Sequence, residues 1–343
     1  MPKPSVLVLY NQPLLPPDHP EADAEHTVVA VAEFIARTLD GAEYDTSLLG
    51  LGSDPTSLWQ ELKRRQPDVA FNLFEGNPDN SETESYVAGL LDWVGLPYTG
   101  SGFSALSLAR AKHTTKYLLR GARLPTADFQ IAHELPSPPC TLEFPVIVKP
   151  ALQDASIGMD QDSVCTNQNQ LTQRVRYVFA TYGPPVLLEE YIPGREFNVS
   201  LLELPDLQAL RPLEIVLPEE EPGTWSIFTY GAKWRTGTPE YDQAQSRFPT
   251  DLTPVILRKL NRLAMKAYRL LGCRDYARVD FRMDPSGKPY ILEVNPNPDI
   301  SMEADLTRCL ESASLSHTEF IVRLVDQALS RSRPQRATPR IGS

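Results

Sequence analysis

The sequence has few of the residues that build disulfide frameworks and histidine-based active sites. Only four cysteines occur in 343 residues, and no two of them form a Cys-x-x-Cys pair. This argues against a zinc site and a disulfide framework, so we expect reduced thiols at Cys140, Cys165, Cys273 and Cys309. The five histidines are dispersed as well, which leaves a histidine-ligated metal or a Ser/His/Asp triad without support.

Long apolar runs and an excess of positive charge are also absent. No run approaches the length that spans a membrane, and the opening stretch MPKPSVLVLYNQPLLPP is too rich in proline for a signal peptide. The formal net charge is −11 at pH 7, which disfavours a groove that follows nucleic-acid phosphates along its length. We therefore predict a cytoplasmic protein that binds neither nucleic acid nor membrane.

The first hundred residues show strands and helices in alternation. The predicted elements are a buried strand at 5–10, a helix at 22–39, a helix at 58–65, a buried strand at 69–74 and a helix at 81–94. This βαβα order predicts a Rossmann-like parallel sheet with covering helices. Ligands of such sheets bind beyond the carboxyl ends of the strands, here near 10–12 and 74–77.

The rest of the chain predicts two further regions and a tail. One region has helices at 104–120 and 170–182 and strands near 129, 145–149 and 185–190. The other has a strand at 195–203, a long loop at 218–241 and a helix from Pro254 to Leu271, capped by Thr253 and stopped by Gly272. We predict an α/β fold, α+β in its C-terminal half, with domains at 1–103, 104–192 and 193–330 and a disordered tail at 331–343.

Two polar runs near the C-terminus predict a metal-binding hairpin. YARVDFRMD and ILEVNPNPD are separated only by PSGKP, a turn sequence that contains glycine. Strand alternation places Arg278, Asp280 and Arg282 on one face, and it predicts a shared face for Ile291, Glu293 and Asn295. Asp280, Glu293 and Asn295 would then offer three hard oxygen ligands to Mg²⁺, which keeps other positions for water and phosphate. The alternative is a solvated polar face of an antiparallel sheet.

Lysine and glutamate side chains at two other strand ends suggest nucleotide binding. Lys149 ends a buried apolar strand, where an anion such as phosphate would offset the cost of its charge. Ser156 and Gly158 fit a turn whose N–H groups approach that phosphate; a surface cap is the alternative for Lys149. Glu189 and Glu190 suit an adenosine slot in which Glu196 reaches the ribose, although an exposed strand end would have the same sequence.

Six motifs in order resemble the D-alanine-D-alanine ligase-like branch of the ATP-grasp superfamily. They are VIVKP, DASIGM, LLEEYIPGREFNV, YGAKW, ARVDF and LEVNPNP, and the resemblance extends over residues 5–325. It implies a three-domain ATP-grasp fold and an ATP-dependent ligase that joins a small-molecule carboxylate to an amine through an acyl phosphate. Two Mg²⁺ ions would assist, with Mn²⁺ able to substitute, and a homodimer is compatible with the resemblance.

The resemblance also implies a role for individual residues. The ATP phosphates would contact Lys112 and Lys149 beneath a loop that contains Ser156, and Lys233 would reach the γ-phosphate. The remaining implied roles are the adenine hinge at Glu189, Glu190 and Ile192, the ribose contact at Glu196, the magnesium ligands Asp280, Glu293 and Asn295, stabilisation of the tetrahedral intermediate by Arg278, and the substrate ammonium contact at Glu25. A solvated helix residue is the alternative for Glu25.

The sequence departs from the family on the substrate side. Asp154 replaces a glycine before Ala155 and Ser156, and Trp234 replaces a tyrosine. The family's His-Gly-x-x-Gly-Glu-Asp-Gly stretch is FEGNPDNS at 74–81, and its Asn-Thr-x-Pro-Gly ending is NPNPD at 295–299. We therefore expect a carboxylate-amine ligase with altered substrates. An authentic D-alanine-D-alanine ligase, an ATP-grasp small-molecule kinase and a nucleotide-binding protein without turnover are the alternatives.

Overall fold

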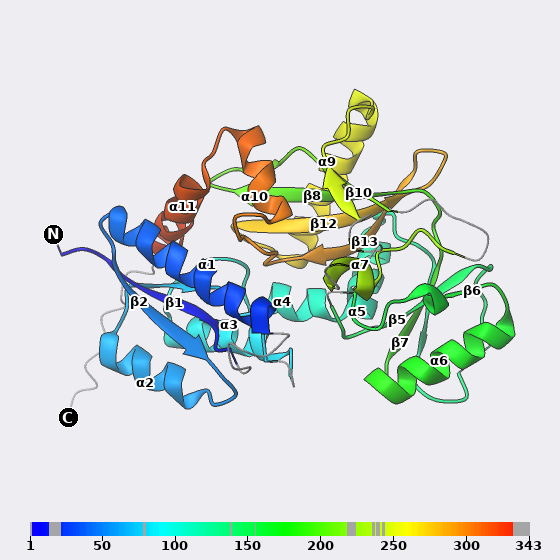
Figure 1. Cartoon of the computed structure of the whole chain (residues 1–343), viewed down its shortest axis with the longest axis horizontal. Coiled ribbons are helices and arrows are strands. Elements are labelled where there is room, and N and C mark those ends of the chain that lie inside the picture. Colours follow the sequence, from blue (N-terminus) through cyan, green and yellow to red (C-terminus); the bar gives the residue numbers. More distant parts are fainter. Residues whose placement is uncertain are drawn as a thin grey trace.

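The protein folds around three β-sheets (Figure 1). The computed structural model describes residues 2–13, 22–77, 80–137, 139–154, 156–217, 224–234, 237, 241 and 244–331. Much of the predicted loop at 218–241 and the predicted tail beyond Arg331 lie outside these residues. None of the described helices combines the length and apolar composition that crossing a membrane requires.

The N-terminal sheet is parallel, as its βαβα sequence pattern predicts. Its strands lie in the order β2-β1-β3. The elements are β1 (Ser5–Asn11), α1 (Ala22–Gly41), β2 (Asp45–Leu51), α2 (Thr56–Arg65), β3 (Val69–Asn72) and α3 (Thr83–Val94). The sequence pattern misses β2 because this strand lies at the sheet edge and only its last residue is buried.

The single helix predicted at 104–120 is wrong, because the chain breaks there into two helices. These are α4 (Phe103–Arg110) and α5 (Lys112–Gly121). Ala111 between them has φ −80° and ψ 80°, outside the helical region. The backbone N–H of Lys112 donates to the carbonyl oxygen of Ala151 at 3.0 Å instead of continuing α4. Lys112 therefore begins a helix, close to the end of a strand in the next sheet.

The central sheet is antiparallel and packs on one long helix. Its strands follow the order β4-β7-β5-β6. The elements are β4 (Phe129–Ala132), β5 (Val146–Pro150), η1 (Gln161–Ser163), β6 (Val164–Cys165), α6 (Gln168–Tyr182) and β7 (Val186–Glu190). Val148 and Leu188 from the strands pack against Val175 of α6. The other strand face, with Lys149 and Glu189, is thereby left toward the third sheet.

The C-terminal sheet has the order β11-β10-β8-β12-β13, with β9 paired to β8. The elements are β8 (Arg195–Glu203), β9 (Leu207–Ala209), β10 (Leu213–Val216), α7 (Tyr230–Trp234), β11 (Gln245–Arg247), α9 (Pro254–Leu271), β12 (Tyr276–Met283), β13 (Pro289–Asn295), α10 (Asp305–Leu310), η2 (Glu311–Ala313) and α11 (His317–Ser330). The described part of the predicted loop at 218–241 thus includes the short helix α7. The predicted ends of α9 are confirmed: Thr253 Oγ1 accepts from Ile256 N at 3.3 Å, and Gly272 has φ +72°.

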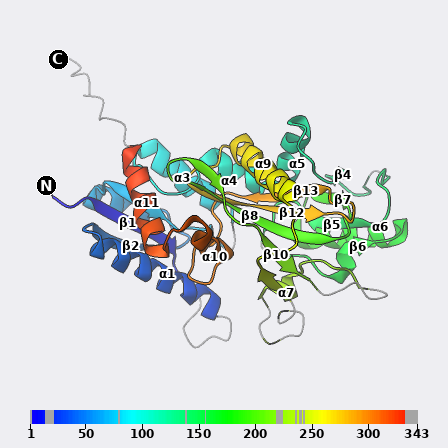
Figure 2. The same cartoon turned by 90° about the horizontal axis from the view of Figure 1, so that it is seen from above.

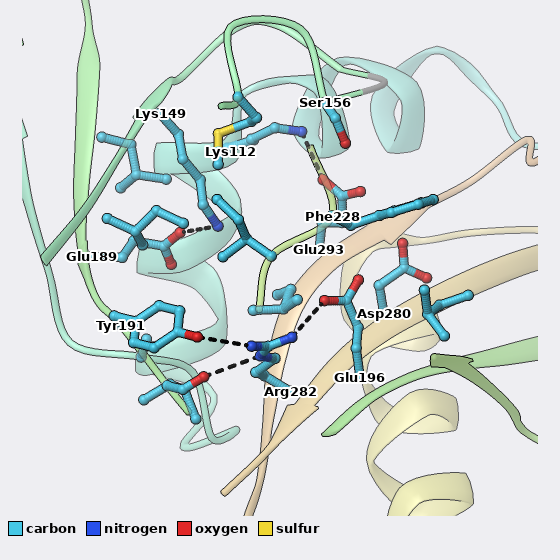
Figure 3. A pocket seen from close by; sticks show the side chains of 18 of the residues that line it. Lys112, Lys149, Ser156, Glu189, Tyr191, Glu196, Phe228, Asp280, Arg282 and Glu293 are labelled. Carbon is cyan, nitrogen blue, oxygen red and sulfur yellow. Dashed lines mark hydrogen bonds and ion pairs between the residues drawn. The ribbon is translucent and has the colours of Figure 1, made fainter. Parts of the chain in front are cut away.

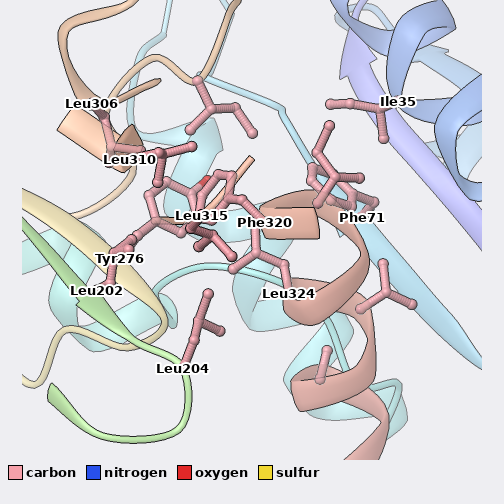
Figure 4. Packing of buried hydrophobic residues seen from close by; sticks show 14 of the residues in the cluster. Ile35, Phe71, Leu202, Leu204, Tyr276, Leu306, Leu310, Leu315, Phe320 and Leu324 are labelled. Atoms are coloured by element: carbon pink, nitrogen blue, oxygen red, sulfur yellow. The ribbon is translucent and has the colours of Figure 1, made fainter. Parts of the chain in front are cut away.

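Helix α11 packs against both the N-terminal and the C-terminal sheet (Figures 1 and 2). Phe320 and Leu324 are fully buried in a cluster that includes Phe71 of the N-terminal sheet and Leu202 of the C-terminal sheet (Figure 4). Arg331, just after α11, makes an ion pair of 2.5 Å with Asp275. Arg331, which the sequence assigns to the disordered tail, is thus held in the folded structure, while the predicted domain limits stay predictions.

Candidate active site

A cleft of about 140 Å³ lies between the central and C-terminal sheets (Figure 3). Most of the residues singled out in the sequence line it, although they come from distant parts of the chain. They are Lys112, Lys149, Ser156, Glu189, Glu190, Ile192, Glu196, Lys233, Arg278, Asp280 and Glu293. The cleft therefore gathers lysines, an arginine and carboxylates in one place, while the role of each residue stays a prediction.

The predicted hairpin forms and holds the three candidate metal ligands together. Strand register pairs Asp280 with Glu293 and Arg278 with Asn295. The Arg278 guanidinium donates to both carboxylate oxygens of Asp280, at 2.7 and 2.9 Å. Asn295 Nδ2 donates to Asp280 Oδ2 at 2.9 Å. Burial raises the pKa of Asp280 although Arg278 opposes this, so the carboxylate would be stabilised by a further cation.

One detail of the predicted hairpin is wrong. The register shifts between Asp280 and Phe281, so that Phe281 pairs with Ile291 and one residue of β13, Leu292, is left over. This β-bulge turns Ile291 into the hydrophobic core while Leu292 and Glu293 both line the cleft. Ile291 and Glu293 therefore do not share a face, because the bulge interrupts the two-residue alternation.

Lys112 connects the hairpin to the loop after β5. Its ammonium group lies 2.8 Å from Glu293 Oε2 and 2.6 Å from Asp154 Oδ1. Burial alone would lower the pKa of Lys112, but the two carboxylates outweigh this effect and raise it. Burial would raise the pKa of Glu293, but the positive charges of Lys112, Arg278 and Lys233 outweigh this effect and keep it far below its usual value. Lys112 thus stays charged where phosphate oxygens would approach.

Two lysines share the carboxylate of Glu189. Lys149 Nζ lies 2.8 Å from Glu189 Oε2, and Lys116 Nζ forms an ion pair with Oε1. Lys116 and Glu189 are both 1% exposed. Burial opposes ionisation of Glu189, yet the two lysines lower its pKa to about 2. Lys149 is the lysine of the two that lines the cleft, whereas Lys116 lies behind it, where burial lowers its pKa.

The donor set of the hairpin fits a magnesium ion. Among the described residues, no three His, Cys, Asp or Glu side chains gather as a ready-made metal centre. Asp280 and Glu293 instead contribute two carboxylates directly opposite each other, and Asn295 adds an amide next to Asp280. Few protein ligands are what Mg²⁺ requires when water and phosphate complete its coordination.

The loop after β5 has the strained backbone of a close-contact turn. Ser156 lines the cleft with φ +60°, and Gly158 has φ +77°. A Cβ at Gly158 would lie 2.8 Å from Pro150 Cγ and 2.9 Å from Tyr182 Cε2, so only glycine fits there. Arg174 of α6 holds the loop by donating to the Gly158 carbonyl oxygen at 2.7 Å.

Lys233 and Glu25 are the remaining predicted residues. Lys233 lies in α7 and lines the cleft, where burial and the charge of Arg278 lower its pKa. A lysine in such surroundings would gain from an anionic partner. Glu25 lies in α1, but its side chain is outside the described part of the structure. Its role stays a prediction.

The sequence interpretation missed three charged residues that organise the site. Lys116 follows Lys112 by one helical turn, and this spacing was a usable signal. Arg282 lies on the same strand face as Asp280, and its buried guanidinium binds Glu196 at 3.1 Å. No sequence pattern pointed to Arg174, because its contacts with Gly158 and Asp160 depend on how α6 packs.

The central and C-terminal sheets, with the charged cleft between them, define an ATP-grasp protein, as predicted. A family model described as the C-terminus of D-ala D-ala ligase matches residues 127–326. A D-alanine-D-alanine ligase of Synechococcus is 30% identical and aligns over 84% of this chain and 86% of its own length. An uncharacterised protein of Sinorhizobium fredii is 32% identical over 77% of this chain and 75% of its own. The chain belongs to the D-alanine-D-alanine ligase family.

Solved structures agree with the fold. The crystal structure of D-alanine-D-alanine ligase from Bacillus anthracis in complex with ATP has a TM-score of 0.73 and 19% sequence identity, and the match covers 96% of this chain and 97% of that one. The corresponding enzyme from Coxiella burnetii has a TM-score of 0.69. The predicted ATP-grasp architecture is thereby confirmed.

Proposed function

We propose that this protein, an ATP-dependent carbon-nitrogen ligase by its family, joins an amino-acid-like carboxylate to an amine in the cleft between its central and C-terminal sheets. The carboxylate attacks the γ-phosphorus of ATP, ADP leaves, and an acyl phosphate forms. The amine then attacks the acyl carbon and releases phosphate. The observation that carries this proposal is the convergence of Lys112, Lys149 and Arg278 with Asp280 and Glu293 around one cleft.

The residues of the cleft divide into four groups by their proposed roles. Lys112, Lys149 and Lys233 would neutralise the phosphate oxygens, since each is held near the carboxylates of the metal hairpin or of Glu189. Arg278 would stabilise the oxyanion that develops when the amine attacks. Ser156 and Gly158 would lie over the phosphates, and Glu190, Ile192 and Glu196 would hold the adenosine.

Magnesium is the cation proposed for the hairpin. Asp280, Glu293 and Asn295 would hold it, with two ions as the predicted number and Mn²⁺ as a substitute. A bound divalent ion neutralises phosphate charge and orients the γ-phosphorus for attack. The homodimer and the cytoplasmic location stay predictions from the sequence.

We further propose that the substrates are not two D-alanines. Three positions where the family has glycine are acidic here, namely Glu75, Asp154 and Asp299. The Glu75 side chain is exposed to solvent, but the protein around it and the charge of Asp299 raise its pKa, while Lys233 and Arg110 lower it, so these groups lie in one region. Asp299 also binds Ser301 N at 2.8 Å and Ser301 Oγ at 2.9 Å. Asp154 is already paired with Lys112 and Arg110, so Glu75 and Asp299 are the added carboxylates that would favour substrates with additional positive charge.

Phosphate release with ATP, Mg²⁺ and paired amino acids tests both proposals. The pairs should include D-alanine with itself, basic amino acids and diamines. A ligase releases phosphate only when carboxylate and amine are both present, and the amide product appears by mass spectrometry. ADP formation with a phosphorylated substrate and no amine would identify a kinase instead. Efficient formation of D-alanyl-D-alanine, with no better pair, would refute the altered substrate choice.

A further inference from the structure

Arg282 is a buried arginine at the hinge end of the cleft (Figure 3). It is only 4% exposed. Its Nε donates to the carbonyl oxygen of Ile192 at 3.0 Å, and its Nη1 donates to Glu196 Oε2 at 3.1 Å. A buried guanidinium costs free energy unless its donors are satisfied. Here they are satisfied by residues that surround the proposed adenosine position.

The same guanidinium also reaches the segment that leads into α7. Its Nη2 donates to the Tyr191 hydroxyl at 3.3 Å and to the carbonyl oxygen of Ser226. The neighbouring Trp225 is fixed by the Gln161 side chain, which bonds its N–H at 2.7 Å and its carbonyl oxygen at 3.1 Å. Arg282 therefore cannot turn away from Glu196 without breaking contacts to two backbone carbonyls.

Because Arg282 is held in place, it also orients the carboxylate of Glu196. A glutamate side chain has three rotatable bonds, and fixing it on binding a ligand costs conformational entropy. A guanidinium that is itself held in place orients the carboxylate before the ligand arrives. The contact uses Oε2, and within the described part of the chain no hydrogen bond to Oε1 is found, so Oε1 can accept one from a hydroxyl group. The ribose of a nucleotide presents such hydroxyls.

We propose that Arg282 is a positioning residue that holds Glu196 toward the ribose hydroxyls and so determines discrimination between ribose and deoxyribose nucleotides. This inference rests on the proposed function, in which Glu196 contacts the ribose. Arg282 itself acts only through Glu196. The reaction chemistry at the phosphates is separate, because Lys112, Lys149 and Glu293 do not contact Arg282 in any described hydrogen bond or ion pair.

The test compares two ratios, measured on the substrate pair found by phosphate release. One is kcat/KM for ATP divided by kcat/KM for 2′-deoxy-ATP, and the other is kcat/KM for ATP divided by kcat/KM for 3′-deoxy-ATP. Arg282→Met and Glu196→Gln should each lower the larger ratio about tenfold, since each removes an oriented hydrogen bond to a charged group. The double variant should have the same lowered ratio as the single variants, because both substitutions act on one contact. Phosphate release at saturating ATP should fall much less than the ratio.

Arg195→Met is the matched control. Arg195 precedes Glu196 on β8, but it binds Glu214 at 2.6 Å and Asp251 at 2.9 Å rather than any residue of the cleft. This variant also removes an arginine from β8, and we expect the ratios of kcat/KM for ATP to kcat/KM for the deoxynucleotides to stay at the wild-type values. Thermal unfolding of all variants separates a loss of folding from a loss of discrimination.

Each outcome decides the inference. A wild-type ratio in Arg282→Met together with a lowered ratio in Glu196→Gln overturns it, while the ligase function stands. Wild-type ratios in both variants overturn it as well, and they also remove Glu196 from the ribose site. If Arg282→Met does not fold, Arg282→Lys decides, because lysine keeps the charge but cannot bind Glu196 and both carbonyls together. A wild-type ratio in that variant overturns the proposal.

Discussion

The ammonium group of Lys112 lies 2.8 Å from the carboxylate of Glu293, although 181 positions separate the two residues in the chain. Lys112 begins helix α5, and Glu293 lies beside the bulge of β13. The pair brings a proposed phosphate contact next to a proposed metal ligand. The proposed phosphate and metal sites would therefore share one wall of the cleft, and a change at either residue should affect both.

Glu293→Gln should abolish most of the turnover and leave the fold intact. Glutamine has the shape of glutamate, but it gives Lys112 and a divalent ion no negative charge. We expect ATP consumption to fall at least about 100-fold, the effect typical of removing one electrostatic contributor from an active site. Steady-state phosphate release measures it. Glu319→Gln, which removes an exposed partner of Arg323 on α11, is the control and should keep full activity.

Removal of divalent metal should stop ATP consumption in the wild-type protein. Chelation with EDTA takes away the charge that Asp280 and Glu293 are proposed to hold next to the phosphates, and excess Mg²⁺ or Mn²⁺ should restore the rate. Asn295→Leu loses the amide oxygen, so its half-saturating Mg²⁺ concentration should rise about tenfold. Turnover that persists in EDTA would contradict the metal site.

Glu189→Gln should destabilise the protein strongly. The substitution leaves Lys116 and Lys149 without the carboxylate that they share, and an uncompensated buried charge costs about 3 to 5 kcal/mol. Chemical denaturation at pH 7 measures this difference in the free energy of unfolding. Glu61→Gln removes a carboxylate from exposed arginines on α2 and should cost less than about 1 kcal/mol.

The stabilising effect of Glu189 should depend on pH, and comparison with Glu189→Gln tests this. Glu189 has a pKa of about 2 in the folded protein, below its ordinary value of 4.5. A depressed pKa contributes stability above pH 4.5 that is lost as the pH falls toward 2. The difference in unfolding free energy between wild type and Glu189→Gln should therefore shrink across this window. A constant difference would show that ionised Glu189 does not stabilise the fold.

Arg331→Ala should also destabilise the protein, although the sequence places this residue in a tail. Its guanidinium binds the fully buried carboxylate of Asp275 at 2.5 and 2.9 Å and the carbonyl oxygen of Tyr98 at 2.8 Å. Asp275 keeps its bond from Gly100 N, so we expect a loss of about 2 kcal/mol. Thermal unfolding measures it. A chain that ends at Ser330 should match Arg331→Ala, and one that ends at Arg331 should match wild type.

The sequence alone determined the features that depend on neighbouring residues. Strand alternation in YARVDFRMD places Asp280 in the cleft and Phe281 in the core, as the structure confirms. Thr253 and Gly272 mark the ends of α9 because capping and left-handed backbone are local requirements. The order and spacing of the six motifs are enough to identify the superfamily. These inferences need only the pleat of a strand, the turn of a helix and the spacing of residue types.

Tertiary structure decided the features that depend on contacts between distant segments. The break at Ala111 depends on a hydrogen bond from Lys112 N to Ala151, and the bulge that turns Ile291 inward depends on the core beneath β13. Arg282 faces the cleft by alternation, but its partners Ile192 and Ser226 belong to other elements. The pairing of Arg331 with Asp275 arises only once α11 packs against both ends of the chain. Periodicity cannot supply such partners, because it specifies which way a side chain points and not what the folded chain brings opposite to it.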